Sequence, residues 1–176
     1  SNQARIPFAY VLNVSRPRPE ARFTFRGVRS VQVPSVATRG NGAFIYAPPE
    51  SNEVLTFDHV YVRPRNGGFK VSFQGDRPFK DMTGINVIRD GPSRWMLAEP
   101  LAYEVYRLAG VPASLTEHLR VWMDGRLQGY QLMIEQPNKA FLARNKRPDG
   151  GNLYKLLWYG QGITGQHEKK TNPATG

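Results

Sequence analysis

The chain has 176 residues, of which 40% are hydrophobic, so it suits one globular domain or one lobe of a larger protein. It has no cysteine, which excludes disulfides, thiolate metal sites and a cysteine nucleophile, and no apolar run approaches the roughly 20 residues that a membrane span requires. The net charge is +10, and the 14 prolines and 17 glycines favour short strands and turns over a helical bundle.

The first 40 residues carry much of the positive charge. They hold seven arginines and one acid, Glu20, a net excess of six. The arginines are Arg5, Arg16, Arg18, Arg22, Arg26, Arg29 and Arg39. Such an excess favours nucleic acid, anionic surfaces or phosphate groups as partners. A solvated basic face is the alternative, because charge alone says nothing about a site.

Strand-like pieces and a glycine turn make up the first third of the chain. Residues 6–14, 22–25 and 28–36 are apolar or alternate with period two, which predicts a hairpin or small meander. Next, Gly40 and Gly42 bracket Asn41, and all three residue types tolerate a left-handed backbone. Successive amides in such a turn can bind an anion. A strand connection without a ligand is the alternative.

Three further strands follow, and one of them carries a lysine. Residues 54–62, 68–73 and 85–88 predict strands. In the second, Phe69, Val71 and Phe73 point to one side, whereas Lys70 and Ser72 point to the other. A lysine on the polar face of a strand is either simply solvated or a functional cation.

Residues 93–109 predict the one long helix, with Gly110 as its stop. An apolar stripe on this helix predicts a buried face, and it consists of Leu97, Leu101, Val105 and Leu108. Glu104 lies on the shoulder of the stripe, and Glu99 projects from nearly the opposite side. A carboxylate beside a buried face needs a cationic partner, such as a lysine or arginine on the facing sheet. The alternative is that the side chain of Glu104 extends beyond the buried face into water. Pro100 adds a kink or a later start.

The clearest local pattern is a hairpin over residues 118–135. Two alternating runs flank Asp124-Gly125, a dipeptide typical of tight hairpin turns. Pro137 lacks the amide that a paired strand needs, so the second strand ends there, and residues 138–145 predict a short helix.

Ordered motifs along the chain resemble the spore coat protein H (CotH) kinase family over roughly residues 36–172. They are RGNGAF, GFKVSF with DRPFK, LAYEVYRLAGVPA, VWMDGRLQGYQLMIEQ, KAFL, DGGNLYK and EKKTN. The resemblance implies an atypical kinase with a protein-kinase-like fold, secreted or on the cell or spore surface. It also implies ATP and a divalent metal such as magnesium as cofactors, and protein substrates.

The resemblance also implies roles for individual residues. Arg39, Gly40, Asn41 and Gly42 resemble the phosphate loop, and Lys70 the strand lysine that contacts nucleotide phosphates. The carboxylate that holds this lysine would be Glu104, with Glu99 second. The hinge for the adenine would be residues 133–136, in which Met133, Glu135 and Gln136 would bind the cofactor.

The acids of a complete kinase are missing from these motifs. After Glu135 the chain contains only two acidic residues, Asp149 and Glu168. Asp149 opens the sequence DGG, so the simplest interpretation is that it stabilises a turn. No catalytic or metal-binding residue is therefore assigned within this chain. The resemblance implies that a C-terminal lobe, which this chain does not contain, carries these acids and binds the protein substrate. Two departures from the family are an insertion of about twenty residues before Lys70 and the Pro137-Asn138 pair after the hinge.

Other chemistry has little support in the sequence. His59, His118 and His167 are far apart and lack cysteines or paired acids nearby, so no zinc site is predicted. No GxSxG motif is present, which argues against a serine triad.

We therefore expect an α+β fold: a protein-kinase-like N-terminal lobe with a twisted antiparallel sheet of five to seven strands packed by one long helix, then a hinge and a short helix. Residues 1–35 would be basic N-terminal strands, 36–136 the lobe and 137–176 the start of a truncated C-terminal lobe. The leading hypothesis is a nucleotide-binding part of a CotH-like kinase. A basic module for nucleic acid or another polyanion, and a structural surface domain without activity, are the alternatives.

Overall fold

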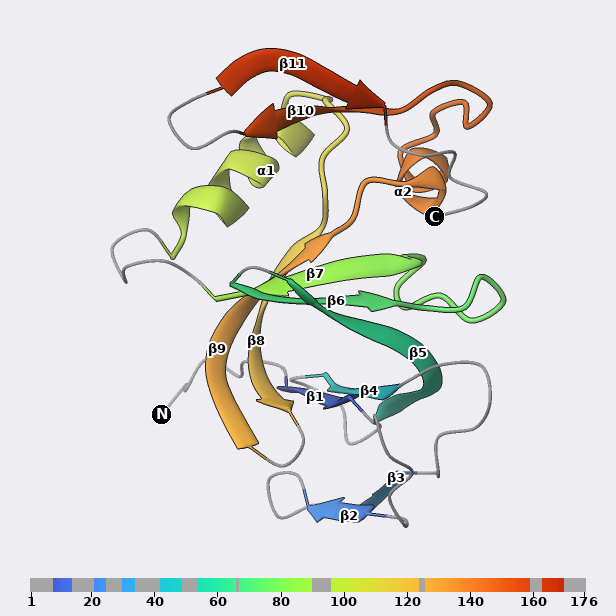
Figure 1. Cartoon of the computed structure of the whole chain (residues 1–176), viewed down its shortest axis with the longest axis vertical. Helices are drawn as coiled ribbons and strands as arrows, with labels where there is room; N and C mark the ends of the chain where they lie inside the picture. The colour runs from blue at the N-terminus through green and yellow to red at the C-terminus, as the bar shows by residue number, and fades with distance from the viewer. Residues whose placement is uncertain are drawn as a thin grey trace. The chain divides into compact units, whose positions relative to one another are not determined.

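A computed structural model describes residues 8–13, 21–24, 30–33, 42–48, 54–65, 67–89, 96–123, 126–158 and 163–169 (Figure 1). Two compact units are formed, Ser1–Gln136 and Pro137–Gly176. The first contains a barrel and a helix, and the second a short helix and a two-stranded sheet. Residues 39–41 of the glycine turn and the Asp124-Gly125 turn lie outside the described residues.

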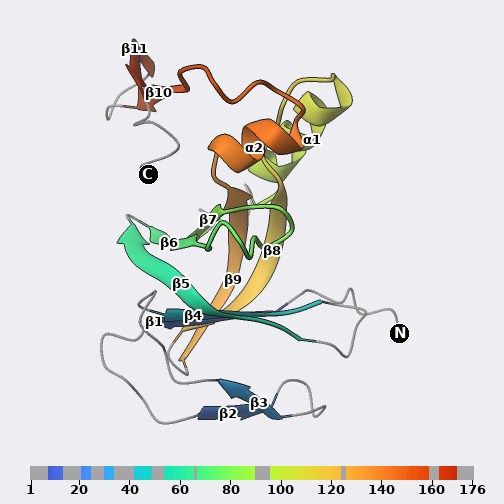
Figure 2. The ribbon, with the colours of Figure 1, turned by 90° about the vertical axis from the view of Figure 1, so that its right-hand side faces the viewer.

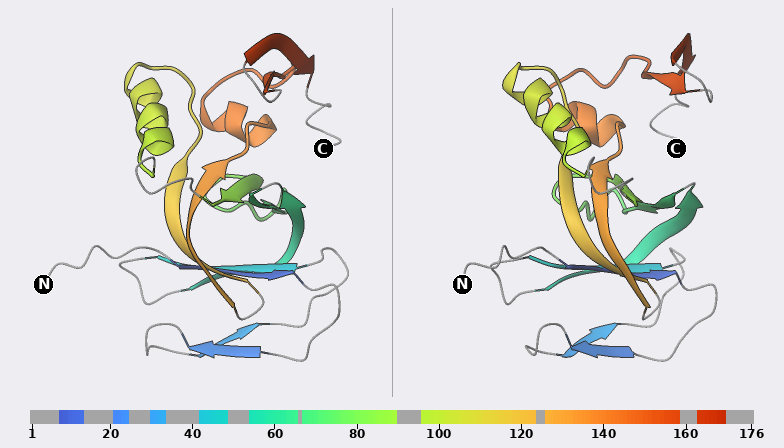
Figure 3. Two further views of the ribbon diagram at one scale, coloured as in Figure 1. Left: turned by 60° about the vertical axis from the view of Figure 1, so that its left-hand side comes forward. Right: turned by 90° about the vertical axis from the view of Figure 1, so that its left-hand side faces the viewer.

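Seven strands of the first unit form one mainly antiparallel sheet that curls until its two edges meet (Figures 2 and 3). They are β1 (Phe8–Asn13), β4 (Gly42–Ala47), β5 (Leu55–Arg65), β6 (Gly68–Ser72), β7 (Gly84–Ile88), β8 (Thr116–Met123) and β9 (Arg126–Glu135). The spatial order is β1-β4-β5-β6-β7-β9-β8, and β1 closes the barrel because it pairs antiparallel with β4 and parallel with β8. Strands β2 (Ala21–Thr24) and β3 (Ser30–Val33) pair separately.

On β6, β7 and β8, side chains that alternate along the strand fill the interior of the barrel. Val71, Val87 and Leu119 are fully buried, as period-two alternation requires. Four phenylalanines fill one region of this core, with neighbouring ring centroids 5.2–6.3 Å apart, and they are Phe44, Phe57, Phe73 and Phe79. Such tilted and edge-on pairs add about 0.5–1.5 kcal/mol each beyond the burial of apolar area.

The long helix, α1 (Ala98–Leu108), does not show the expected packing against the sheet. None of its residues is buried, and Leu97, Leu101, Val105 and Leu108 are 57–77% exposed. Spacing along a helix shows that one face is apolar but not what covers that face. The later start is confirmed, because α1 begins at Ala98, so Pro100 falls in the first turn, where its missing amide removes no helix hydrogen bond.

The hairpin and the break at its end agree with the sequence pattern. Strands β8 and β9 pair antiparallel from Thr116 opposite Ile134 to Met123 opposite Arg126, with one irregularity after Val121. Beyond the break comes α2 (Lys139–Arg144), whose first turn is capped by the Asn138 side chain, which accepts from the Phe141 amide at 3.2 Å.

The second unit continues from α2 into a hairpin of β10 (Tyr154–Trp158) and β11 (Ile163–Lys169). Neither described helix combines the length and apolarity needed to cross a membrane.

Candidate functional site

Lys70 lies on the outer face of the barrel, in a row of side chains that crosses neighbouring strands. Phe69 and Val71 point into the core, so Lys70 points outward from β6. Its register partners are Arg63 on β5 and Asn86 on β7, and Asn86 is in turn opposite Ile134 on β9. Strands lie about 4.8 Å apart, so Lys70 is about 10 Å from the strand that leads into the hinge.

The charged neighbours that shift the pKa of Lys70 are both cations. Partial burial, followed by the charges of Arg65 and Arg63, lowers the pKa of the Lys70 ammonium below its ordinary value of 10.5. Among the described residues, none of these three cations forms an ion pair with a carboxylate. We call Arg63, Arg65 and Lys70 the cationic row. No described carboxylate compensates the charge of this row, so a bound anion would reduce the repulsion between its members.

The structure does not bring the helix glutamates to this lysine. Glu104 accepts hydrogen bonds from Arg107 on the same helix, with Nε to Oε2 at 3.0 Å. Glu99 is exposed in the first turn of α1, where a carboxylate suits the helix dipole. Burial and the charge of Glu99 raise the pKa of Tyr103. The expected pairing of Glu104 with Lys70 depended on a helix packed against the sheet, and α1 leaves its apolar stripe exposed.

The predicted phosphate turn and hinge are only partly within the described residues. Gly42 is buried as the first residue of β4, whereas Arg39, Gly40 and Asn41 lie outside. At the hinge, Met133 and Glu135 are 1% exposed, and the Glu135 carboxylate accepts from the Leu115 amide at 3.0 Å.

The hinge amides that an adenine would use are already engaged. The N–H of Glu135 donates to Leu115 O and the N–H of Gln136 donates to Gly84 O, at 2.8 and 2.9 Å. The side-chain Oε1 of Gln136, by contrast, is buried and has no hydrogen-bond partner. Gln136 therefore offers an open acceptor at the end of β9.

A lysine–glutamate pair does occur, between residues that the sequence reasoning did not select. Lys80 Nζ lies 2.8 Å from Glu117 Oε2 and donates to Tyr46 Oη at 3.0 Å, and the Tyr46 hydroxyl donates to Glu117 Oε1 at 2.8 Å. Burial, followed by the hydrogen bond and charge of Glu117, strongly raises the pKa of Tyr46. Lys80 Nζ also lies 4.5 Å from the centre of the Tyr46 ring, a cation–π contact.

The turn that carries Lys80 has an unusual backbone. Lys80 and Asp81 have φ of 49° and 62°, values that favour glycine or asparagine. They form the two central residues of a tight turn in which Phe79 and Met82 exchange both backbone hydrogen bonds, at 2.8 and 3.0 Å. Phe79 and Met82 are both fully buried, so core packing holds the turn in this conformation.

One signal in the sequence could have found Glu117. It precedes Leu119 by two residues, so period two places it on the same side of β8 as the core. An acid in a core row needs a partner. Nothing in the sequence pattern identifies Lys80 as that partner, because the turn brings it there.

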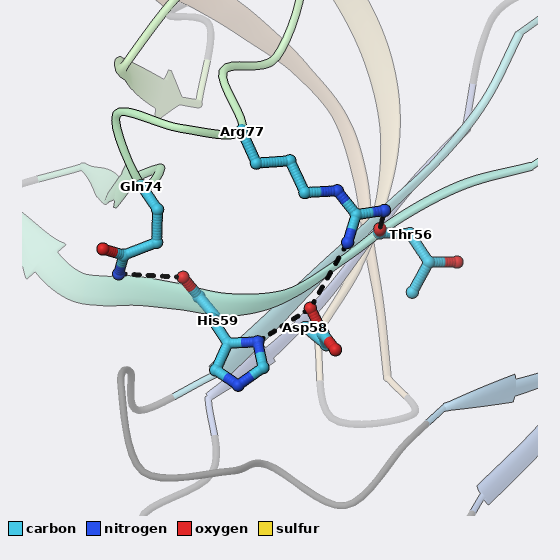
Figure 4. A network of polar contacts seen from close by, with 5 residues as sticks. All are labelled: Thr56, Asp58, His59, Gln74 and Arg77. Atoms are coloured by element: carbon cyan, nitrogen blue, oxygen red, sulfur yellow. Dashed lines mark hydrogen bonds and ion pairs between the residues drawn. The ribbon is translucent and has the colours of Figure 1, made fainter.

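A second polar network ties β5 to the connection after β6 (Figure 4). His59 Nδ1 lies 2.8 Å from Asp58 Oδ1, and Arg77 lies 3.6 Å from the same oxygen and donates to Thr56 O at 2.7 Å. Gln74 donates to His59 O at 3.2 Å. The sequence interpretation of His59 as lacking a paired acid is therefore wrong, because its neighbour in the chain, Asp58, is such an acid.

Charge in this network favours the ionised acid. Burial alone would raise the pKa of Asp58, but the hydrogen bond from His59 and the charges of His59 and Arg77 outweigh it and lower that pKa. A cavity of about 410 Å³ lies beside these residues. In the part of the chain that the structure describes, no three histidines or acids gather as a metal site. In the second unit, Asp149 pairs with Lys139 at 3.1 Å.

Comparison with protein families identifies a match over much of the chain. The model of the family described as CotH kinase protein matches residues 63–174, more than half of the chain. This span includes Lys70, Glu104 and the hinge but leaves out residues 39–42. No curated protein sequence matches the chain.

Proposed function

The chain belongs to the CotH kinase protein family, and on that premise we propose that its barrel unit binds the phosphate groups of ATP at the cationic row. The family makes the protein kinase-like, so the proposal is a nucleotide site in an N-terminal lobe that works with a C-terminal lobe. In this proposal residues 36–136 are the lobe, and the start of a C-terminal lobe is residues 137–176. The division of the chain after Gln136 supports that assignment.

The observation that carries the proposal is the uncompensated charge around Lys70. Arg63, Arg65 and Lys70 project from two neighbouring strands, and no described carboxylate neutralises them. Phosphoryl transfer depends mainly on positioning the phosphates and cancelling their charge, and a planar guanidinium can bind a phosphate through two parallel hydrogen bonds. A triphosphate here would relieve the repulsion between the three cations.

The adenine end of the proposal rests on Gln136. Its buried Oε1 lacks a donor, and the exocyclic amine of adenine is a donor. Because the amides of Glu135 and Gln136 are engaged, the base would bind through this side chain and through carbonyl oxygens. The row that runs from Lys70 to Ile134 spans the distance between phosphates and base along one face of the sheet.

The remaining parts of the reaction are assigned by family membership. Magnesium would be held by carboxylates and by the phosphates themselves, and a protein hydroxyl would receive the phosphoryl group. In this proposal a C-terminal lobe supplies those acids and binds the protein substrate outside the cell or at its surface. The role of the barrel is to hold and orient the nucleotide.

Thermal unfolding with Mg-ATP and with inorganic tripolyphosphate tests this site. Both should raise the melting temperature of the 176-residue chain, by an amount that grows with ligand concentration over its dissociation constant. Lys70→Met and Arg63→Gln should each abolish most of the rise. Arg126→Gln, which removes an exposed charge at the start of β9, should leave it intact.

The competing function is binding of nucleic acid or another polyanion, which the same cationic row and the net charge of +10 favour. It predicts tight binding of single-stranded oligonucleotides that weakens steeply with salt, and no selectivity for ATP over tripolyphosphate. Gln136→Leu separates the two, because it should weaken ATP and leave tripolyphosphate and oligonucleotides unchanged. Failure of every ligand to shift the melting temperature would refute both functions and favour a structural domain.

A further inference from the structure

A second cavity lies at the end of the barrel away from the hinge. Its volume is about 340 Å³, and it lies where the turn between β5 and β6 meets the end of β8 and the beginning of β9. Val62, Phe69 and Met123 supply apolar walls, and among the described lining residues the polar side chains are those of Arg89, Gln128 and Gln131. This size and composition are typical of sites for small organic molecules.

Gln131 is a buried lining residue of this cavity whose amide oxygen has no hydrogen-bond partner among the described residues. It is opposite Leu119, whose side chain fills the core, so Gln131 also points to the interior of the barrel. It is only 2% exposed, and its Oε1 has no hydrogen-bond partner. Buried amide oxygens nearly always accept a hydrogen bond, so we expect a molecule in the cavity to donate one to this atom.

Arg89 places a positive charge at the same end of the barrel. Ile88 is opposite Leu132, so the next residue along, Arg89, comes level with Gln131. Its amide donates to Gly67 O at 2.8 Å, which holds the backbone in place. Among the residues that the structure describes, the guanidinium makes one long hydrogen bond, 3.4 Å to Gln128 Oε1, and no carboxylate lines the cavity. The net charge of the lining favours an anionic group on the occupant.

We propose that this cavity binds a small carboxylic acid with an apolar body and a hydroxyl group. The hydroxyl donates to Gln131 Oε1, the body packs against Val62, Phe69 and Met123, and the carboxylate pairs with Arg89. Because Phe69 points inward and Lys70 outward, this site is inside the barrel and the cationic row is on its surface. The two sites are therefore independent, and neither proposal depends on the other.

Amide NMR spectra of the whole chain, titrated with 4-hydroxyphenylacetate, test the proposal. Saturable shifts are expected at Gly67, Gly68 and Gln131, whereas Lys70 and Gln136 should not respond. Phenylacetate lacks the hydroxyl, so its dissociation constant should be roughly fivefold higher, the change expected from the loss of one hydrogen bond. In Gln131→Leu the two acids should bind with equal affinity.

Matched variants separate the roles of the two polar groups. Arg89→Gln should weaken both acids by about tenfold or more, because a charge-assisted bond is lost. Arg63→Gln removes the same charge from the outer face, and Gln136→Leu removes the other buried amide oxygen without a partner, so neither should change the affinity for either acid. Met123→Phe keeps both polar groups but fills the cavity, and it should weaken both acids even if Gln131→Leu does not fold.

Three results would overturn the proposal. One is the absence of saturable shifts at millimolar 4-hydroxyphenylacetate, which would mean that water alone occupies the cavity. The second is equal affinity of the wild-type chain for the two acids. The third is an affinity that Arg89→Gln leaves unchanged.

Discussion

Replacing Lys70 by methionine should make the ligand-free protein more stable. The ammonium is partly buried opposite Arg63 and near Arg65, and these surroundings lower its pKa below 10.5. The unfolded chain therefore binds the proton more tightly than the folded chain, so the charged lysine destabilises the fold at neutral pH. This penalty fades as the pH rises from the folded pKa through 10.5.

The size of the effect follows from a like-charge pair on neighbouring strands. Such a pair costs up to about 1 kcal/mol when the side chains are partly solvated. Removing it should raise the melting temperature by about 1–4 °C for a chain of this length. Salt should reduce the difference, because it screens partly exposed charges.

Thermal unfolding followed by circular dichroism at low and high salt measures this difference. Lys70→Arg keeps the charge and should bring no gain. Lys80→Met removes a lysine that has a carboxylate partner, so it should lower the melting temperature. The reasoning would be refuted if Lys70→Met were destabilising at neutral pH, or if its gain were the same at all salt concentrations.

Three further changes probe other contacts. Glu117→Gln removes the charge that Lys80 pairs with, so it should cost about 1–3 kcal/mol by denaturant unfolding, and an unchanged midpoint would contradict the pairing. Asp58→Asn should cost about 0.5–1 kcal/mol at neutral pH, because a carboxyl with a lowered pKa stabilises the fold above its ordinary pKa of 3.8. This cost, measured by denaturant unfolding, should shrink as the pH falls through the folded pKa, and a cost that does not change with pH would contradict the reasoning. Gly68→Ala should cost more than about 1 kcal/mol, since the added methyl would lie 2.0 Å from Val87 O, and a neutral result would show that β6 and β7 are further apart.

Local patterns predicted the strands well because they report local geometry. Alternation placed Lys70 on the outer face and Phe69 in the core, and Pro137 marked the end of the paired strand. These features depend on residues next to one another in the chain, so the sequence suffices for them.

Contacts between distant segments were beyond those patterns. The exposed stripe of α1 removed the basis for pairing Glu104 with Lys70, and the acid that does pair with a lysine, Glu117, meets Lys80 only through a turn with positive φ at two residues. The orphaned oxygens of Gln131 and Gln136 likewise become visible only when burial and partners are known.

Strand β1 covers both edges of the curled sheet. Because β1 bonds to both β4 and β8, the barrel offers no open row of backbone donors and acceptors to a neighbouring molecule. A chain lacking residues 8–13 would expose two such rows at once, and the simplest way to satisfy them is to recruit the same strands from another copy. Strand β1 thus keeps both edges from pairing with another copy of the chain.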